Sequence, residues 1–251
     1  MPILSASDAS PIAPILMEAA ELRVSFGGVK ALDGMDFEVH RGEAIGLLGQ
    51  NGSGKTTLIN VLTGLLVPES GFVTFCDQSM LGRKPEEYSR AGVGRVFQSV
   101  QVFPRLTLAE NLTLMQIGAQ GAFKVDRDAV ERILDRIGLA IYANEWAQEL
   151  SYGEQRLLEI GMALAAGWQL IFLDEPTAGL SPMMVDRVST LLGEVNESGV
   201  ALVIIEHQTD VVFGLCERVW VMDQGRLLAK GTPDEIQHNE QVLESYLAGT
   251  Q

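Results

Sequence analysis

The sequence predicts an α/β fold with a mainly parallel sheet, an N-terminal antiparallel β subdomain and an inserted α-helical subdomain. Brief apolar runs at 93–97, 169–173, 201–205 and 218–222 suit strands that are buried on both faces. The helical stretch at 183–196 lies between two of these runs and favours a parallel sheet covered by helices. With 47% hydrophobic and 20% charged residues, the chain of 251 residues fits one globular unit with an inserted lobe.

The N-terminal part predicts a tail followed by paired strands. Residues 1–16 include a stretch rich in Ser, Ala and Pro and are expected to form a flexible tail, so the folded domain is expected to span 17–251. Short strand-like segments follow at 22–24 and 35–39. Glycine-containing turn signals separate these segments, which is more typical of antiparallel pairing.

Helical periodicity replaces the strand signal in the middle of the chain. Between 106 and 166 the apolar residues recur at helical spacing, so we expect a helical subdomain at about 99–166, inserted into the sheet domain. A final strand is expected at 226–230. The run Thr232-Pro233-Asp234 then predicts the cap of a C-terminal helix that ends near Leu247.

A glycine-rich loop lies between the strand-like segment 44–48 and the helix-like segment 58–62. This order of strand, loop and helix is the setting of a phosphate-binding loop, so the sheet domain is expected to have a P-loop NTPase core. Glycines allow the backbone to turn sharply and to direct its N–H groups at the oxygens of a polyphosphate. The side chain of Lys55 can reach the terminal phosphates, and the Thr56 hydroxyl can ligate Mg²⁺. The residues expected to bind the nucleotide are Gly49, Gln50, Asn51, Gly52, Ser53, Gly54, Lys55, Thr56 and Thr57.

Two carboxylates follow the apolar run 170–173 at the end of a predicted strand. In P-loop NTPases the acid at this strand end binds Mg²⁺, and a following carboxylate can activate water for attack on the γ-phosphate. The alternative is an ordinary strand that runs into an acidic turn. In combination with Lys55, the pattern favours Asp174 as a metal ligand and Glu175 as the catalytic base.

Gln98 and His207 also follow strand-like runs, and both are therefore expected near the same edge of the sheet. A single glutamine or histidine in such a position is usually structural or merely exposed. Their order along the chain is what gives them functional weight.

The motif LSYGEQ at 150–155 lies shortly before the strand that carries Asp174. It resembles the signature motif of the ATP-binding subunits of ATP-binding cassette (ABC) transporters, and the resemblance runs from about 18 to 247. It implies an ABC ATPase that binds ATP and Mg²⁺ and couples ATP hydrolysis to transport. Gln98 is then the Q-loop residue, which is catalytic and near the metal, and His207 is the catalytic switch histidine.

The same resemblance implies further nucleotide contacts. Ser151 and Gly153 are the signature residues that the family uses at the phosphate, and residues 178–181 correspond to the D-loop. Phe26 stands where the family has an aromatic residue that stacks on adenine. The alternative for Phe26 is a buried core residue.

Three positions depart from the family pattern. Tyr152 and Glu154 replace the common glycine and glutamine of the signature, and Ser181 replaces the common aspartate of the D-loop. In the family two ATP-binding subunits pack head to tail, so that each ATP lies between the phosphate loop of one subunit and the signature helix of the other. Because Ser151 and Gly153 are kept, nucleotide binding is still expected.

Several segments resemble the ATPase subunits of importers for branched-chain amino acids and related amides such as urea, namely 26–32, 94–98, 150–161 and 178–181. The resemblance implies transmembrane permease subunits, a second ATP-binding subunit of the same or a related kind, and indirectly a solute-binding protein outside the membrane. The alternatives are the ATPase subunit of an exporter and a soluble ABC ATPase outside transport.

The composition limits which partners the chain can bind and which cellular compartment suits it. A formal charge of −15 would repel a nucleic-acid backbone over most of the surface, so no nucleic-acid partner is expected. The two cysteines, Cys76 and Cys216, lie far apart and suit a reducing compartment. No apolar run approaches the roughly 20 residues that cross a bilayer. We therefore expect a cytoplasmic chain, and the resemblance to transporter subunits implies a peripheral position on the cytoplasmic face of the inner (plasma) membrane.

Overall fold

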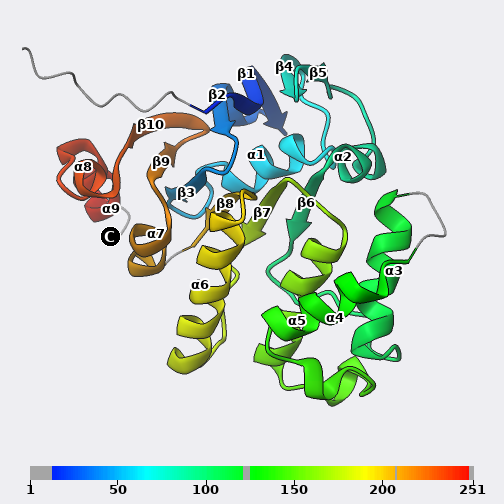
Figure 1. Cartoon of the computed structure of the whole chain (residues 1–251). Helices are drawn as coiled ribbons and strands as arrows, with labels where there is room; N and C mark the ends of the chain where they lie inside the picture. The colour runs from blue at the N-terminus through cyan, green and yellow to red at the C-terminus, as the bar shows by residue number, and fades with distance from the viewer. Residues whose placement is uncertain (1–12, 121–124, 207, 249–251) are drawn as a thin grey trace, which may run out of the picture.

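Two sheets and the helices around them make up the computed structural model, which describes residues 13–120, 125–206 and 208–248. Figure 1 shows the N-terminal sheet at the top, the central sheet below it and a group of helices at the lower right. The predicted fold class is confirmed: the central sheet is mainly parallel, the N-terminal sheet is antiparallel, and a helical subdomain interrupts the central sheet.

The central sheet has the strand order β10-β9-β3-β8-β7-β6. All neighbouring pairs are parallel except β9 and β10. Because parallel strands end at the same edge of a sheet, the carboxyl ends of β3 and β7 lie on one edge with β8 between them. The strands span Ala44–Gly49 (β3), Val93–Val96 (β6), Leu170–Asp174 (β7), Ala201–Ile205 (β8), Arg218–Asp223 (β9) and Arg226–Gly231 (β10).

Both faces of the central sheet are buried, as its continuous apolar runs predict. On β7, Ile171 and Leu173 belong to the core shared with the helices, whereas Leu170 and Phe172 belong to the core beneath the N-terminal sheet. This alternation follows from the two-residue period of a strand.

The N-terminal sheet has the strand order β2-β1-β4-β5, with every pair antiparallel. Its strands span Ile15–Phe26 (β1), Val29–His40 (β2), Ser70–Phe75 (β4) and Gln78–Ser79 (β5). Strand β1 is much longer than the predicted segment 22–24, because bulges and the positive φ of Glu21 (52°) break the alternation that marks a strand in sequence. It also includes residues 15 and 16 of the expected tail; residues 1–12 lie outside the described part.

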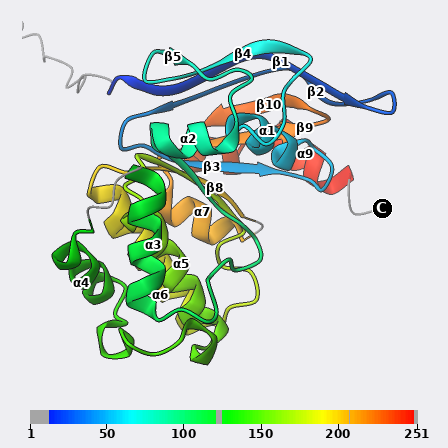
Figure 2. The same cartoon turned by 90° about the vertical axis from the view of Figure 1, so that its right-hand side faces the viewer.

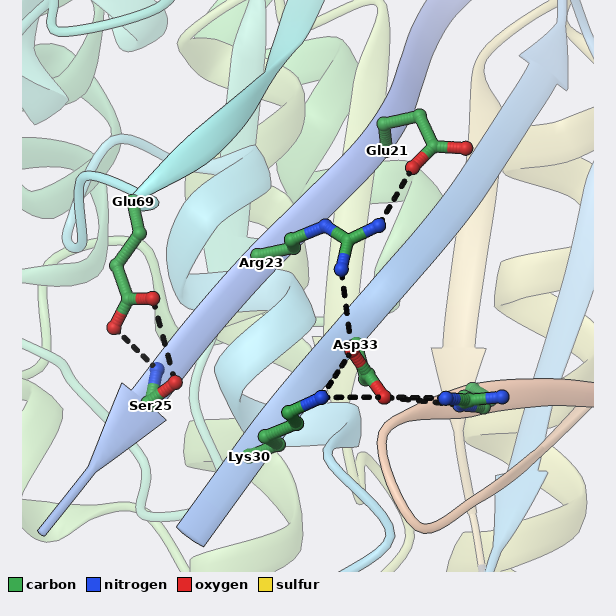
Figure 3. Close-up of polar contacts among 7 residues, drawn as sticks. Glu21, Arg23, Ser25, Lys30, Asp33 and Glu69 are labelled. Carbon is green, nitrogen blue, oxygen red and sulfur yellow. Dashed lines mark hydrogen bonds and ion pairs between the residues drawn. The ribbon is translucent and has the colours of Figure 1, made fainter. Parts of the chain in front are cut away.

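The carboxylate of Asp33 ties this sheet to the central one (Figure 3). Asp33 on β2 accepts hydrogen bonds from Lys30 at 3.1 Å and from Arg226 on β10 at 2.5 Å. The hydrogen bond from Arg226, followed by that from Lys30, lowers the pKa of Asp33. Arg23 on β1 adds a contact at 3.5 Å, so one carboxylate joins three strands.

The helices between β6 and β7 form the helical subdomain, which Figure 2 shows below the central sheet. The side chain of Asp126 caps α4, and that of Ser151 caps α5 through a reciprocal capping box with Glu154. Its α-helices span Leu108–Gln120 (α3), Arg127–Arg136 (α4) and Tyr152–Ala165 (α5), and two 3-10 helices span Ala140–Tyr142 (η1) and Ala147–Glu149 (η2).

The other helices are α1 (Lys55–Leu62), α2 (Pro85–Ala91), α6 (Pro182–Glu197), α7 (Thr209–Leu215), α8 (Pro233–Gln237) and α9 (Glu240–Ala248). Strands β4 and β5 and helix α2 are not among the elements expected from the sequence. One C-terminal helix is expected where the structure has two. Thr232 caps α8 as expected, but the Asn239 side chain accepts a hydrogen bond from the N–H of Val242 and starts a new helix.

Candidate functional site

The phosphate-binding loop joins β3 to α1 and approaches two neighbouring strands closely. Gly49 and Gly54 have positive φ angles of 147° and 105°. A Cβ atom on Gly49 would lie 2.3 Å from the carbonyl oxygen of Met222 on β9, and one on Gly54 would lie 2.4 Å from that of Ala31 on β2. Only glycine fits at these two positions, so the steric environment dictates the glycine pattern of the loop.

Lys55, the first residue of α1, folds back over the loop. Its Nζ donates hydrogen bonds to the carbonyl oxygens of Gly49 at 2.7 Å and Gln50 at 2.9 Å. Burial lowers the pKa of Lys55, while the carboxylates of Glu175 and Asp174 act in the opposite direction. An ammonium group held by neutral oxygen atoms of the loop, which include Ser53 Oγ at 3.4 Å, can exchange them for phosphate oxygens, which form stronger, charge-assisted bonds.

A cavity of about 290 Å³ opens between the loop and the end of β7. It brings most of the predicted loop residues together with both predicted carboxylates. Gly49, Gln50 and Ser53 belong to the loop without lining this cavity. The lining residues are Ala31, Asn51, Gly52, Gly54, Lys55, Thr56, Thr57, Asp174, Glu175 and Ile205.

Asp174 forms an ion pair with Arg95, which is not among the site residues expected from the sequence. Its Oδ2 accepts from Arg95 Nη2 at 2.6 Å, and Arg95 Nη1 donates to Asn60 Oδ1 on α1 at 2.6 Å. Arg95 lies on β6, where a charged residue inside an otherwise apolar strand is the signal that would have identified it. The arginine thereby fixes Asp174 relative to α1.

The Gln98 side chain contacts Glu175, which lines the cavity. The amide Nε2 of Gln98 donates to Glu175 Oε2 at 2.8 Å, although the two residues are 77 positions apart. Glu175 has a φ of 47°, a sparsely populated conformation for a residue with a side chain. Strain of this kind concentrates at functional sites, where the surrounding structure holds it in place.

The other predicted phosphate contacts lie at the start of α5. Ser151 is the N-cap residue, and Gly153 packs so closely on α6 that a Cβ atom there would lie 2.8 Å from Met184 Cε. Neither residue lines the cavity beside the loop. Within one copy of the chain, the loop and the signature residues are therefore separate.

Comparison with known proteins identifies this combination of loop, carboxylates and signature helix. Residues 32–178, from β2 to the segment after β7, match the family described as ABC transporter. The chain belongs to the ABC transporter family. Residues 226–247 also match a family described as branched-chain amino acid ATP-binding cassette transporter.

The similarity extends over nearly the whole ABC subunit. The chain is 35% identical over 248 residues to the high-affinity branched-chain amino acid transport ATP-binding protein LivG of Escherichia coli, covering 92% of this chain and 97% of the relative. It is 34% identical to BraF of Pseudomonas aeruginosa, which has the same description, with the same coverage. The resemblance to ATP-binding subunits of this family is thus confirmed.

Solved ABC structures have the same fold. The ADP conformation of MJ1267, an ATP-binding cassette of an ABC transporter, superposes with a TM-score of 0.83 at 30% identity, covering 94% of this chain and 99% of that chain. The ATP-binding cassette MJ0796, in a dimeric post-hydrolysis state bound to ADP and Pi, gives a TM-score of 0.76 at 25% identity, with coverages of 87% and 99%. This chain is accordingly an ABC ATPase subunit that binds nucleotide.

The departures from the ABC signature cluster in space. The Ser151 hydroxyl donates to Glu154 Oε2 at 2.6 Å, and the same carboxylate accepts from the Ser151 N–H at 2.9 Å. A Cβ atom on Gly179 in the D-loop would lie 3.7 Å from the Tyr152 ring. Ser181 is the N-cap residue of α6. Tyr152 therefore lies beside the D-loop, and Glu154 engages the hydroxyl that the family uses at the phosphate.

Three remaining predicted residues have different outcomes. The side chain of Phe26, at the end of β1, is 55% exposed, so the alternative that it is a buried core residue is wrong. The Gln50 side chain does not line the cavity and donates to the carbonyl oxygen of Ser245 on α9. His207 lies outside the described residues.

Proposed function

We propose that this ABC subunit hydrolyses ATP in the cavity between the phosphate loop and β7. The loop N–H groups and Lys55 bind the phosphates, and Phe26 stacks on adenine. Glu175 acts as the general base for the attacking water, and Gln98 and His207 orient the reacting groups. The observation that supports this proposal best is the 2.8 Å hydrogen bond between Gln98 and Glu175, beside a cavity that Lys55 also lines.

Mg²⁺ would be held by oxygen atoms of Thr56, Gln98 and Asp174. Hydroxyl, amide and carboxylate oxygens are the hard donors that Mg²⁺ prefers alongside water and phosphate oxygens. Thr56 and Asp174 line the same cavity, and Gln98 reaches Glu175 at its edge. The donor set therefore fits this ion, which when bound neutralises charge on the phosphates.

The solute proposed for the transporter is a branched-chain amino acid or a related amide such as urea, taken up by import. Similarity to LivG and BraF over 92% of the chain supports this assignment. The match of residues 226–247 to the branched-chain amino acid family adds support from a segment outside the catalytic core. Solute choice itself would belong to the membrane subunits and a solute-binding protein.

Transmembrane permease subunits are the proposed partners, with this chain on the cytoplasmic face of the inner membrane and a second ATP-binding subunit completing each ATP site. Among the described residues, no helix is long and apolar enough to cross a membrane. A groove of about 230 Å³ lies beside Gln101, and its two phenylalanines, Phe97 and Phe103, are 39% and 42% exposed. We propose that a short helix of the permease docks there.

Purification and uptake assays together test the assignment. We expect the chain to copurify with permease subunits from membranes, and a strain that lacks it to lose uptake of labelled leucine or urea. Phe103→Asp should abolish copurification because it puts a charge into the groove, whereas Ile141→Asp is the control, since Ile141 is 84% exposed and lies elsewhere. Unchanged uptake combined with lost efflux would indicate an exporter, and a chain found without membrane partners would indicate a soluble ABC ATPase.

A further inference from the structure

The loop from 97 to 101, which carries Gln98, is held by two side chains of α5. Arg156 Nη1 donates to the carbonyl oxygen of Phe97 at 2.7 Å, and Nη2 donates to that of Gln98. Glu159 Oε1 accepts from the N–H of Gln101 at 3.0 Å. Arg156 and Glu159 are themselves joined by an ion pair of 2.6 Å. A single ion pair therefore contacts the backbone at both ends of the loop.

This ion pair is buried, and the lost hydration of its charges makes it a poor source of stability. Arg156 is 0% and Glu159 6% exposed. A buried ion pair often contributes no more to stability than two apolar side chains of similar volume, because both charges lose their hydration. The Nε of Arg156 also has no hydrogen-bond partner, which adds a cost. What an apolar pair would not provide is the set of directional contacts to the loop backbone.

Those contacts connect two parts of the ATP site. The signature residue Ser151 is the N-cap of helix α5, and Arg156 follows little more than one turn later. Arg156 holds the Gln98 carbonyl, and the Gln98 side chain reaches Glu175 at 2.8 Å. The position of the signature helix and the position of Gln98 are thus mechanically linked through one guanidinium group.

We propose that Arg156 is a positioning residue for ATP hydrolysis, which holds Gln98 in register with Glu175 while Glu159 orients the guanidinium group. The inference rests on the proposed roles of Gln98 and Glu175. Glu159 also lines the groove proposed for the permease helix, together with Gln101. A helix in that groove would therefore contact the same ion pair that holds Gln98.

The test replaces the ion pair by apolar residues of similar size, in the double variant Arg156→Met with Glu159→Leu, which leaves no unpaired buried charge. We expect the kcat of ATP hydrolysis to fall about 10- to 100-fold, the range for a misplaced catalytic group, and the KM for ATP to stay within about twofold. Arg187→Met is the matched control. Arg187 also donates to two carbonyl oxygens, those of Ile137 at 3.0 Å and Gly138 at 3.2 Å, but it does not contact the loop from 97 to 101. Its kcat should stay near that of the wild type.

Combination with Gln98→Ala separates positioning from a general structural effect. If Arg156 acts through Gln98, adding Arg156→Met and Glu159→Leu to Gln98→Ala should lower kcat little below that of Gln98→Ala alone. The side chain that is positioned is already absent from Gln98→Ala. Arg156→Lys keeps the charge but lacks the planar guanidinium group that donates to both carbonyl oxygens, so it should also lower kcat. A wild-type kcat in both Arg156→Lys and the double variant, or fully additive effects with Gln98→Ala, would overturn the proposal. A wild-type protein that binds ATP without hydrolysing it would instead contradict the proposed function itself.

Discussion

At the scale of single residues, the Glu175 carboxylate carries the proposed chemistry. It lines the cavity and receives a hydrogen bond from Gln98 at 2.8 Å. Glu175→Gln keeps the shape of the side chain but removes the base, so we expect ATP binding to persist and hydrolysis to fall by about 10²-fold or more. Equilibrium titration with ATP and a phosphate-release assay measure the two effects. A near-normal turnover would remove Glu175 from the role of general base.

A second prediction at the residue scale concerns Glu159 and the pH dependence of the free energy of unfolding. Burial raises its pKa from 4.5 to about 7, although Arg156 and the N–H of Gln101 act in the opposite direction. At pH values between 4.5 and about 7, Glu159 is protonated in the folded chain and ionised in the unfolded chain. Its contribution to the free energy of unfolding is therefore present at low pH and is lost as the pH rises through about 7.

Urea denaturation of the wild type and of Glu159→Gln at pH 6 and pH 8 measures this effect. We expect the wild type to lose about 1 kcal/mol more free energy of unfolding over that interval than the variant, which has no carboxyl group to titrate. Parallel pH dependences of the two proteins would show that Glu159 titrates as an ordinary glutamate.

Predictability from sequence differs between residues of the site. Lys55 and the two carboxylates that line the cavity follow recognisable strand ends, and chain order alone suffices to place them at one edge of the sheet. Arg95 and Arg156 contact Asp174 and the Gln98 backbone through the fold of segments distant in sequence, and isolated arginines carry no local pattern. The sequence therefore predicts the groups proposed for the reaction better than the groups that hold them.

At the scale of secondary-structure elements, the C-terminal helix α9 supports the phosphate loop. The Gln50 side chain donates to the Ser245 carbonyl, and Val242 of α9 is buried in the main core. A chain that ends at 238 loses both contacts. We expect its Kd for ATP to rise about fivefold, which corresponds to one hydrogen bond of about 1 kcal/mol that holds the loop.

The control for this truncation is a chain that ends at 248, which keeps all of α9. Gln50→Leu removes the hydrogen bond without removing the helix and should raise the Kd for ATP by a similar factor. Isothermal titration calorimetry measures the three proteins. Unchanged affinity in both the truncated chain and Gln50→Leu would show that α9 has no influence on the loop.

Strands that are apolar over most of their length were predictable, whereas short or largely exposed elements were not. The buried strands β8 and β9 stand out as apolar runs because both of their faces are covered. The short strand β5 is exposed at the edge of the N-terminal sheet, and α2 buries only Tyr88, so neither leaves an apolar pattern. The division of the C-terminal segment into α8 and α9 depends on one side-chain cap at Asn239, which is weaker than the periodicity around it.

At the scale of the whole molecule, we propose that one chain carries the two walls of an ATP site at separate places. The phosphate loop lines its cavity with Lys55, whereas Ser151 at the start of α5 is exposed and does not line it. A helix N-terminus attracts anions, so the start of α5 suits the γ-phosphate of an ATP bound to another copy. The related cassette MJ0796 is dimeric in its post-hydrolysis state with ADP and Pi bound.

Mixing two inactive variants tests whether the site is shared between chains. Lys55→Ala removes the loop cation, and Ser151→Asp keeps the helix cap but puts a carboxylate against the phosphate. Each variant alone should be nearly inactive, because every site in its dimer is defective. In an equal mixture, half of the dimers contain one chain of each kind. Each mixed dimer has one intact site out of two. The activity should therefore recover to as much as about a quarter of the wild type. A mixture no more active than its components, under conditions where the wild type turns over, would mean that the loop and the signature of two copies do not meet at one nucleotide.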